Sequence, residues 1–179
     1  QNGHGVAQDY KKAVAWFQKA AEQGYARGQD NLGDMYYYGR GVEKDYKKAV
    51  AWFQKAAEQG YAAAQNNLGV MYQNGHGVAQ DYKKAVAWFQ KAAEQGYAVA
   101  QNNLGVMYDN GQGVEKDDKK AVEWYQKAAE QGNADAQYDL GEMYQNGYGV
   151  ARSVEQARMW YEKAAAQGHQ GAKNALSRL

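Results

Sequence analysis

The chain has 179 residues, with 21 Lys and Arg against 20 Asp and Glu, 45% hydrophobic residues, and neither cysteine nor proline. Its net charge of +1 offers no excess of basic side chains for a run of phosphates, so we expect no nucleic-acid binding. The lack of cysteine excludes disulfides and thiolate metal sites. No apolar run reaches the length of a bilayer span, so we expect no membrane insertion.

Tryptophan recurs every 36 residues, at Trp16, Trp52, Trp88, Trp124 and Trp160. A fixed period without insertions is typical of repeats that stack, since a single repeat cannot bury its own apolar face. In chain order the pattern predicts a helix over 9–23, four helix pairs, and a short helix over 169–178. We therefore predict an all-α protein, an α/α solenoid of 36-residue helix-turn-helix repeats.

The first helix of a repeat is represented by the segment after Tyr61. Ala64, Leu68 and Met71 have the spacing of one helix face. Gly69 interrupts this helix, and we expect it to allow close contact with the paired helix. Gly75 is expected to end the helix in the left-handed conformation.

The second helix of the same repeat is predicted to begin after Asp81, a residue type that caps helix N-termini well. Trp88 and Phe89 are expected on its buried face, and Gly96 ends it. Val78, in the connector, is expected to tuck between the two helices. The Lys-Lys pair at 83 and 84 recurs in other copies and is expected on a solvated ridge.

These signals divide the chain, taken as one array over 1–179, into a partial repeat 1–24, full repeats 25–60, 61–96, 97–132 and 133–168, and a partial C-terminal helix 169–179. Residues 1–24 are identical to 73–96, but the helix that precedes residue 73 has no counterpart before residue 1. We therefore expect a fragment of a longer protein. The apolar face of helix 9–23 then lacks a neighbour, which predicts end-to-end self-association through this helix.

Residues of catalytic type are few. His4 and His76 hold the same repeat position, so they cannot share one metal, and His169 lies far along the chain. Ser153 is expected to cap a helix, and Ser177 replaces a framework glycine, which leaves no basis for a Ser–His–acid triad. The Gly-x-Gly pairs lack the third glycine and the Lys-Ser/Thr ending of phosphate loops. We expect no enzyme, no metal and no cofactor.

The repeat reads A-x-x-x-L-G-x-x-Y-x-x-G-x-G-V-x-x-D-x-x-K-A-x-x-W-(Y/F)-x-K-A-A-x-Q-G. In one copy the matching residues are Ala64, Leu68, Gly69, Tyr72, Gly75, Gly77, Val78, Asp81, Lys84, Ala85, Trp88, Phe89, Lys91, Ala92, Ala93, Gln95 and Gly96. This pattern resembles the Sel1-like repeat, a relative of the 34-residue tetratricopeptide repeat.

The resemblance implies a right-handed α/α superhelix with the first helix of each pair on the concave side. It also implies a role as an adaptor or scaffold that binds other proteins. Some bacterial members are secreted or periplasmic and carry paired cysteines, which this chain lacks. The compartment therefore stays unassigned.

Four positions of the first helix differ between copies whose framework is otherwise kept. At 100° per residue these positions lie within about 80° of one another, opposite the apolar stripe. The resemblance places this side on the concave face, and Asn31, Asn67, Asn103 and Asp139 border it. The candidate partner-binding residues are Arg27, Asp30, Asn31, Asp34, Tyr37, Asn66, Asn67, Val70, Gln73, Val99, Asn102, Asn103, Val106, Asp109, Asp135, Tyr138, Asp139 and Glu142.

Carboxylates outnumber basic groups in this set, and tyrosines add contacts of the kind enriched at binding hot spots. We therefore expect a scaffold for a protein or peptide partner with basic character. An alternative explanation for the differences between copies at these four positions is neutral drift on a solvated face. Two other functions stay open: an idealised or recently duplicated array without a dedicated partner, and a binder of cell-wall fragments or another small ligand.

Overall fold

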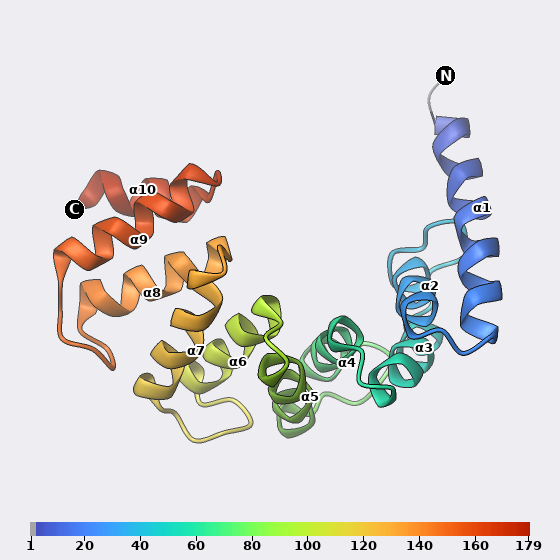
Figure 1. The fold of residues 1–179 in the computed structure, drawn as a ribbon, viewed down its shortest axis with the longest axis horizontal. Helices are drawn as coiled ribbons and strands as arrows, with labels where there is room; N and C mark the ends of the chain where they lie inside the picture. Colours follow the sequence, from blue (N-terminus) through green and yellow to red (C-terminus); the bar gives the residue numbers. More distant parts are fainter. Residues whose placement is uncertain (1–2) are drawn as a thin grey trace. The chain divides into compact units, whose positions relative to one another are not determined.

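The computed structural model describes residues 3–179. For residues 3, 4 and 8 it describes the backbone only. Over this range the chain forms helices only (Figure 1). They are α1 (Gly3–Glu22), α2 (Ala26–Tyr38), α3 (Tyr46–Glu58), α4 (Ala62–Asn74), α5 (Tyr82–Glu94), α6 (Ala98–Asn110), α7 (Asp118–Glu130), α8 (Ala134–Asn146), α9 (Val154–Ala166) and α10 (Gln170–Arg178). The predicted all-α class and the paired helices are confirmed. None of these helices has the length and apolar character that crossing a bilayer requires.

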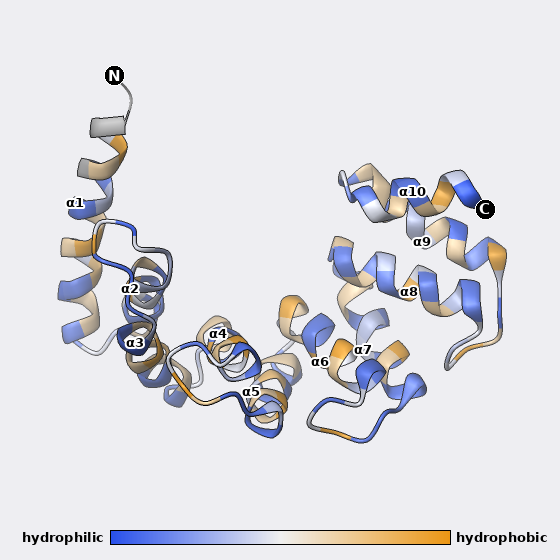
Figure 2. Ribbon diagram, turned by 180° about the vertical axis from the view of Figure 1, so that it is seen from behind, coloured by the Kyte–Doolittle hydropathy of each residue, from blue (hydrophilic) through white to orange (hydrophobic). Residues whose placement is uncertain are grey.

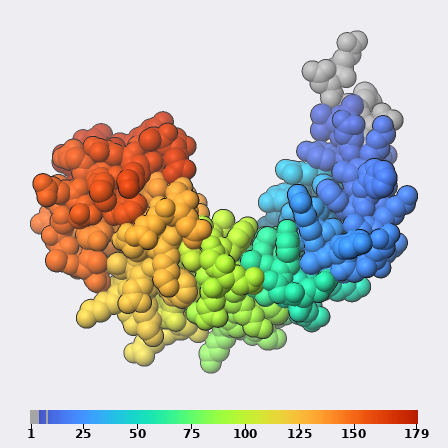
Figure 3. Space-filling view, in the orientation of Figure 1, coloured from blue at the N-terminus to red at the C-terminus, as the bar shows by residue number. Residues whose placement is uncertain are grey.

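The chain divides into two compact units, residues 1–92 and 93–179. In unit 1, α2 packs against α1 and α3, and α3 packs against α4. In unit 2, each helix from α6 to α10 packs against the next one, and the atoms of α8, α9 and α10 form a continuous body (Figure 3). Within each unit the structure is thus a stack of helical hairpins, an α/α solenoid.

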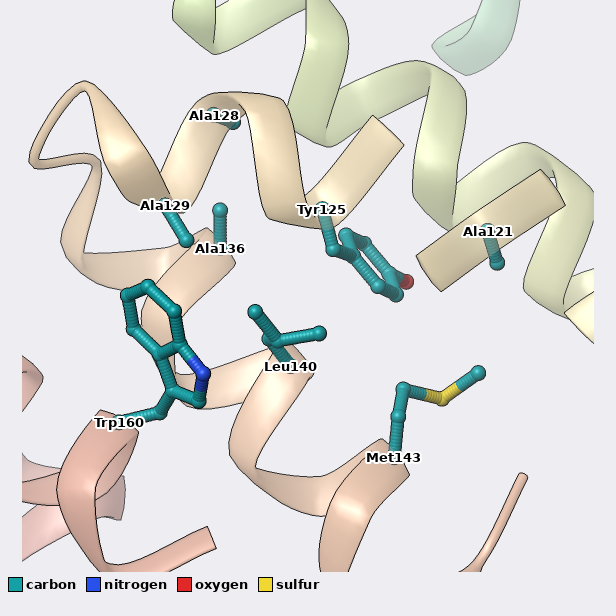
Figure 4. Packing of buried hydrophobic residues seen from close by; sticks show 8 residues of the cluster. All are labelled: Ala121, Tyr125, Ala128, Ala129, Ala136, Leu140, Met143 and Trp160. Atoms are coloured by element: carbon teal, nitrogen blue, oxygen red, sulfur yellow. The ribbon is translucent and has the colours of Figure 1, made fainter. Parts of the chain in front are cut away.

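The predicted apolar faces form the core. Ala64, Leu68 and Met71 of α4 are completely or almost completely buried, in a cluster with Phe53 of α3. In unit 2, Tyr125, Leu140 and Trp160 bring α7, α8 and α9 together (Figure 4). Colouring by hydropathy shows hydrophilic and hydrophobic residues together on every helix (Figure 2). Side-chain packing of these amphipathic helices therefore holds the stack together.

Gly69 has the close contact that the sequence predicts. A Cβ added to Gly69 would lie 2.6 Å from Cε1 of Phe89 in α5. Gly141 and Tyr161 repeat this relationship in unit 2, again at 2.6 Å. Only glycine lets the aromatic ring of the second helix pack directly on the backbone of the first.

The predicted caps are also present. Gly75 has φ 67° and donates its backbone N–H to the carbonyl of Met71, as a left-handed C-cap does. The side chain of Asp81 accepts a 3.1 Å hydrogen bond from the backbone N–H of Lys84. In the connector, half-buried Val78 packs against the unit 1 core. Ser153 caps α9 in the same way as Asp81 caps α5, at 3.2 Å from Gln156 N.

Helix α1 differs from its prediction, because it begins at Gly3 instead of near residue 9. In the matching segment of the third repeat, the preceding helix fixes the connector: the backbone N–H of His76 donates to Met71 and that of Asp81 to Tyr72. In α1 the corresponding residues 3–8 are part of the helix instead.

The tryptophans are less uniformly buried than predicted. Trp160 is only 4% exposed, but Trp88 is half-buried, and Lys91 lies over its ring at 4.5 Å. Lys55 and Trp52 show the same arrangement at 4.6 Å. The ammonium group of a lysine three residues along the helix thus lies over the indole ring in a cation–π contact.

Trp16 of α1 is 71% exposed. Trp160, at the matching position of the last full repeat, packs instead on Leu140 of the preceding first helix. The predicted exposure of the apolar face of α1 is thus seen at Trp16, whereas Phe17 is half-buried and Ala21 is buried.

Candidate functional site

The candidate residues lie on α2 and α4 in unit 1 and on α6 and α8 in unit 2. We call the side of these helices that bears them the first-helix face. Their exposure differs by position along the helix. The exposed residues are Arg27, Val99, Asp135 and Glu142; the half-buried ones are Asn31, Asp34, Tyr37, Asn67, Val70, Gln73, Asn103, Val106, Asp109, Tyr138 and Asp139; and the buried ones are Asp30, Asn66 and Asn102.

The three buried residues share one repeat position, which therefore lies in the packing between helices. Asp30 is only 5% exposed, and one of its carboxylate oxygens accepts a 2.9 Å hydrogen bond from the side chain of Asn67. The fourth residue at this position, Tyr138, is half-buried and donates a 2.8 Å hydrogen bond to Glu142. The predicted direct contact of Asp30, Asn66 and Asn102 with a partner is therefore restricted by their burial, and neighbouring residues of the face are more accessible.

Unit 1 carries a cavity of about 170 Å³ between α2 and α4, above Phe53 of α3. Both sides of the cavity include candidate residues. Its lining consists of Asp34, Tyr37, Tyr38, Phe53, Asn67, Val70 and Met71. The rings of Tyr37 and Tyr38 meet edge to face with centroids 4.8 Å apart. The cavity thus combines an acidic group, an amide, aromatic rings and an aliphatic wall.

Unit 2 carries a cavity of about 230 Å³ at the same repeat positions, between α8 and α10. Glu142 takes the position of Asp34, Tyr161 that of Phe53, and Arg178 that of Val70. The hydroxyl of Tyr161 donates a 2.6 Å hydrogen bond to Gln145, also in the lining. The first-helix face is therefore hollowed in both units at equivalent places.

Several carboxylates on this face are held away from water. The pKa of Asp30 is raised to about 6, chiefly because the carboxyl group is buried. The hydrogen bond from Asn67 lowers this pKa, and the negative charge of Asp34 raises it. Burial also raises the pKa of Asp34, which Arg40 partly offsets. The pKa of Asp139 rises to about 7, first through burial and then through Glu142, Asp135 and Asp109. Ionising any of these carboxyl groups therefore costs more free energy in the folded chain than in water.

Counter-charges on this face are sparse. Lys116 lies 3.5 Å from Asp109, and His169 lies 3.3 Å from Asp135. Across residues 3–179, neither Asp34 nor Glu142 has a basic group within ion-pair distance. Carboxylates thus outnumber basic side chains among the candidate residues, although the chain is nearly neutral.

The histidines and serines have structural contacts. His76 stacks on Tyr46 with ring centroids 4.4 Å apart, and His169 accepts the backbone N–H of Ala172 at 3.1 Å. Ser177 donates to the carbonyl of Asn174. The side chain of His4 lies outside the described residues. Within those residues, no three His, Asp or Glu side chains converge to hold a metal ion.

The second helices carry a basic ridge of exposed lysines, as the paired lysines predict. Lys48 lies 5.4 Å over the ring of Tyr36, and Lys84 lies 5.4 Å over that of Tyr72. The ridge therefore covers aromatic rings of the preceding helix. These contacts give the second lysine of each pair a packing role.

Phe53, Met71 and Tyr161 line the cavities, although their repeat positions are those of the apolar faces. The sequence does not show that a core side chain also forms part of a cavity. Arg178 holds the repeat position of Val70 in the terminal helix, and a comparison of repeat positions as far as α10 identifies it.

A profile of the Sel1 repeat matches residues 1–25, 26–61, 62–97, 98–133 and 134–169. Among curated proteins, no sequence matches the chain.

Solved structures give close matches. A Sel1 repeat protein from Oxalobacter formigenes is 40% identical with a TM-score of 0.88, over 93% of this chain and 66% of that one. Protein c5321, a protective antigen present in uropathogenic Escherichia coli strains, is 44% identical with a TM-score of 0.87, over 98% of this chain and 38% of that one. Cysteine rich protein B of Helicobacter pylori is 30% identical with a TM-score of 0.59, over 74% of this chain and 96% of that one.

The chain thus spans 66% and 38% of the lengths of the first two proteins. The profile covers nearly all of the chain as consecutive repeats, and the helix pairs agree with the solved folds. The chain therefore belongs to the Sel1 repeat family.

Proposed function

We propose that this chain is a non-enzymatic scaffold that binds a protein or peptide with basic character along the first-helix face. The observation that carries the proposal is a carboxylate without an ion-pair partner in each of two cavities at equivalent repeat positions, half-buried Asp34 in unit 1 and exposed Glu142 in unit 2, beside aromatic rings. Repeats of this fold commonly mediate protein–protein interaction. The single array over residues 1–179 is part of the same proposal.

Desolvation supports the basic character of the partner. The carboxylates of Asp34 and Asp139 are harder to ionise in the folded chain than in water, as their raised pKa values indicate. A cationic group that approaches them favours their charged forms and is itself attracted. Tyr37 lines the unit 1 cavity with Asp34, and Tyr138 lines the unit 2 cavity with Glu142, and both rings supply amphipathic contact area.

Charge reversal on the face tests the proposal. The double variant Asp34→Lys and Glu142→Lys places one change in each cavity, and Glu58→Lys with Glu130→Lys makes equal changes at exposed positions of the second helices. Binding to an array of short peptides that differ in net charge is measured for both variants. We expect basic peptides to bind the parent chain and the control but not the face variant.

The two alternatives give different results in the same assay. If no peptide binds the parent chain above background at low ionic strength, the array without a dedicated partner is favoured. If peptides fail but a peptidoglycan fragment binds in a titration, the chain is a small-ligand binder. Either result contradicts the scaffold proposal.

A second proposal concerns α1. We propose that two copies associate end to end, with α10 of one copy covering α1 of the other. The uncovered side of α1 carries Trp16, and Trp160 packs on a first helix at the matching place. Since α10 is a first helix at the other end of the chain, it offers the type of element that α1 lacks. Such head-to-tail contacts build open chains of copies.

A further inference from the structure

The cavity in unit 1 contains a carboxylate with no neutralising group. Asp34 is half-buried in its wall. Across residues 3–179, no side chain donates a hydrogen bond to Asp34, and the nearest basic influence, Arg40, forms no ion pair with it. A half-buried carboxylate of this kind gains from a cation that brings its own hydrogen-bond donors.

The equivalent cavity in unit 2 already contains such a cation. Arg178 lines it together with Glu142, Tyr138 and Tyr161, and its charge lowers the pKa of Tyr138 against the other influences on that ring. In unit 1 the position of Arg178 is held by Val70, and that of Glu142 by Asp34. The acid is thus kept in both cavities, whereas the arginine is present in only one.

The rings around the unit 1 cavity can accept a guanidinium group. Arg40, which lies outside the cavity lining, places its guanidinium carbon 4.6 Å from the centre of the Tyr38 ring. Tyr37 stands edge-on to Tyr38 and lines the cavity with it. Planar guanidinium groups stack on such rings better than ammonium groups do.

We propose that the unit 1 cavity receives an arginine side chain of the partner, with the guanidinium donating to Asp34 and the aliphatic stem against Val70 and Met71. This inference rests on the proposed function and deepens it, because it names the side chain and its place. The cavity of about 170 Å³ is well above the space that a single water needs. The amide of Asn67, in the same lining, borders the site.

The test uses the full chain and three capped tripeptides, Gly-Arg-Gly, Gly-Lys-Gly and Gly-citrulline-Gly. Citrulline keeps the shape of arginine but carries no charge. Titrations followed by backbone and side-chain amide NMR report both affinity and place. We expect the arginine peptide to shift signals of residues 34–38 and 67–71, the lysine peptide to bind more weakly, and the citrulline peptide to cause no comparable shifts.

Two variants alter the cavity and one serves as a matched control. Asp34→Asn removes the charge with little change in shape, and Val70→Arg supplies the arginine from within the chain, as Arg178 does in unit 2. We expect both to weaken binding of the arginine peptide by about tenfold, the scale of a charge-assisted hydrogen bond. Glu58→Gln, an equal charge change on α3 outside the cavity, should leave the affinity unchanged.

Equal binding of the citrulline peptide, equal affinity of the lysine peptide, or unchanged affinity in Asp34→Asn overturns the inference. If Val70→Arg does not fold, as judged by its NMR spectrum, Asp34→Asn decides alone. The broader proposal fails separately. Basic peptides that bind the first-helix face while Asp34→Asn has no effect refute only the arginine cavity, whereas failure of all longer basic peptides refutes the scaffold.

Discussion

The side-chain amide of Asn67 donates a 2.9 Å hydrogen bond to the carboxylate of Asp30 in the preceding repeat. This bond joins α4 to α2 directly beneath the first-helix face. Two other copies have asparagine in place of Asp30, namely Asn66 and Asn102. An amide oxygen can accept the same bond without a charge, so the repeat architecture does not require the carboxylate.

Replacing Asp30 with Asn should alter how stability depends on pH. The folded pKa of Asp30 is about 6, above its ordinary value of 3.8. The stability that this group contributes is therefore complete below pH 3.8 and is lost as the pH rises through about 6. We expect Asp30→Asn to resemble the parent chain near pH 4 and to be more stable by roughly 2 kcal/mol at pH 8, as urea unfolding at several pH values can measure.

Asp139→Asn is the matched change in unit 2, since Asn31, Asn67 and Asn103 hold its position in other copies. Its folded pKa of about 7 places the same loss of stability at a higher pH. The gain at pH 8 should again be about 2 kcal/mol, because partial exposure screens the charge. A parent chain and variant with parallel pH profiles would show that these carboxylates ionise freely in the folded state.

Gly69→Ala should destabilise unit 1. The added Cβ would stand 2.6 Å from the ring of Phe89, which is completely buried and cannot move away. We expect a loss of about 2 kcal/mol or more, even though alanine favours the helix by roughly 1 kcal/mol. Thermal unfolding followed by circular dichroism measures it.

Gly5→Ala is the control for this change, since Gly5 lies within α1 with nothing within 4 Å of an added Cβ. This variant should be neutral or slightly stabilising. Equal midpoints for Gly69→Ala and the parent chain would mean that the ring contact does not constrain the helix pair.

Buried glutamines link successive repeats, and Gln137→Ala should break one link. Gln137 is 5% exposed; it donates to the carbonyl of Ala129 at 3.1 Å and accepts a 2.9 Å bond from Gln167. We expect a loss of about 2 kcal/mol in the unfolding free energy, because the variant loses the buried bond to Ala129 and the part-buried bond from Gln167. Gln126→Ala, which removes an exposed bond to Glu130, should cost under about 0.5 kcal/mol. Similar losses in the two variants would contradict a special role for the buried link.

Trp16→Lys should abolish self-association. Sedimentation velocity of the parent chain should show a sedimentation coefficient that rises with concentration, and the variant should stay monomeric. Tyr148→Lys adds the same charge at another exposed aromatic residue and should behave as the parent chain does. A parent chain that remains monomeric at the highest concentration would refute the end-to-end contact.

The candidate site was only partly predictable. Angular spacing correctly separates the first-helix face from the Ala64–Leu68 stripe, because a helix fixes directions by sequence alone. It does not show that Asp30 lies buried in that face whereas Glu142 is exposed. Burial at these positions depends on the neighbouring helix, whose residues are one repeat away.

The sequence by itself determined the repeat, the helix pairs and their caps, because each follows from local spacing and backbone conformation. Only the tertiary structure decided which faces are covered. It extended α1 to Gly3 and left Trp16 exposed, although residues 1–24 have the same sequence as residues 73–96. It also placed a lysine over the indole of Trp88 and an acid without a partner in the unit 1 cavity. Those outcomes depend on contacts between repeats, which identical local sequences cannot specify.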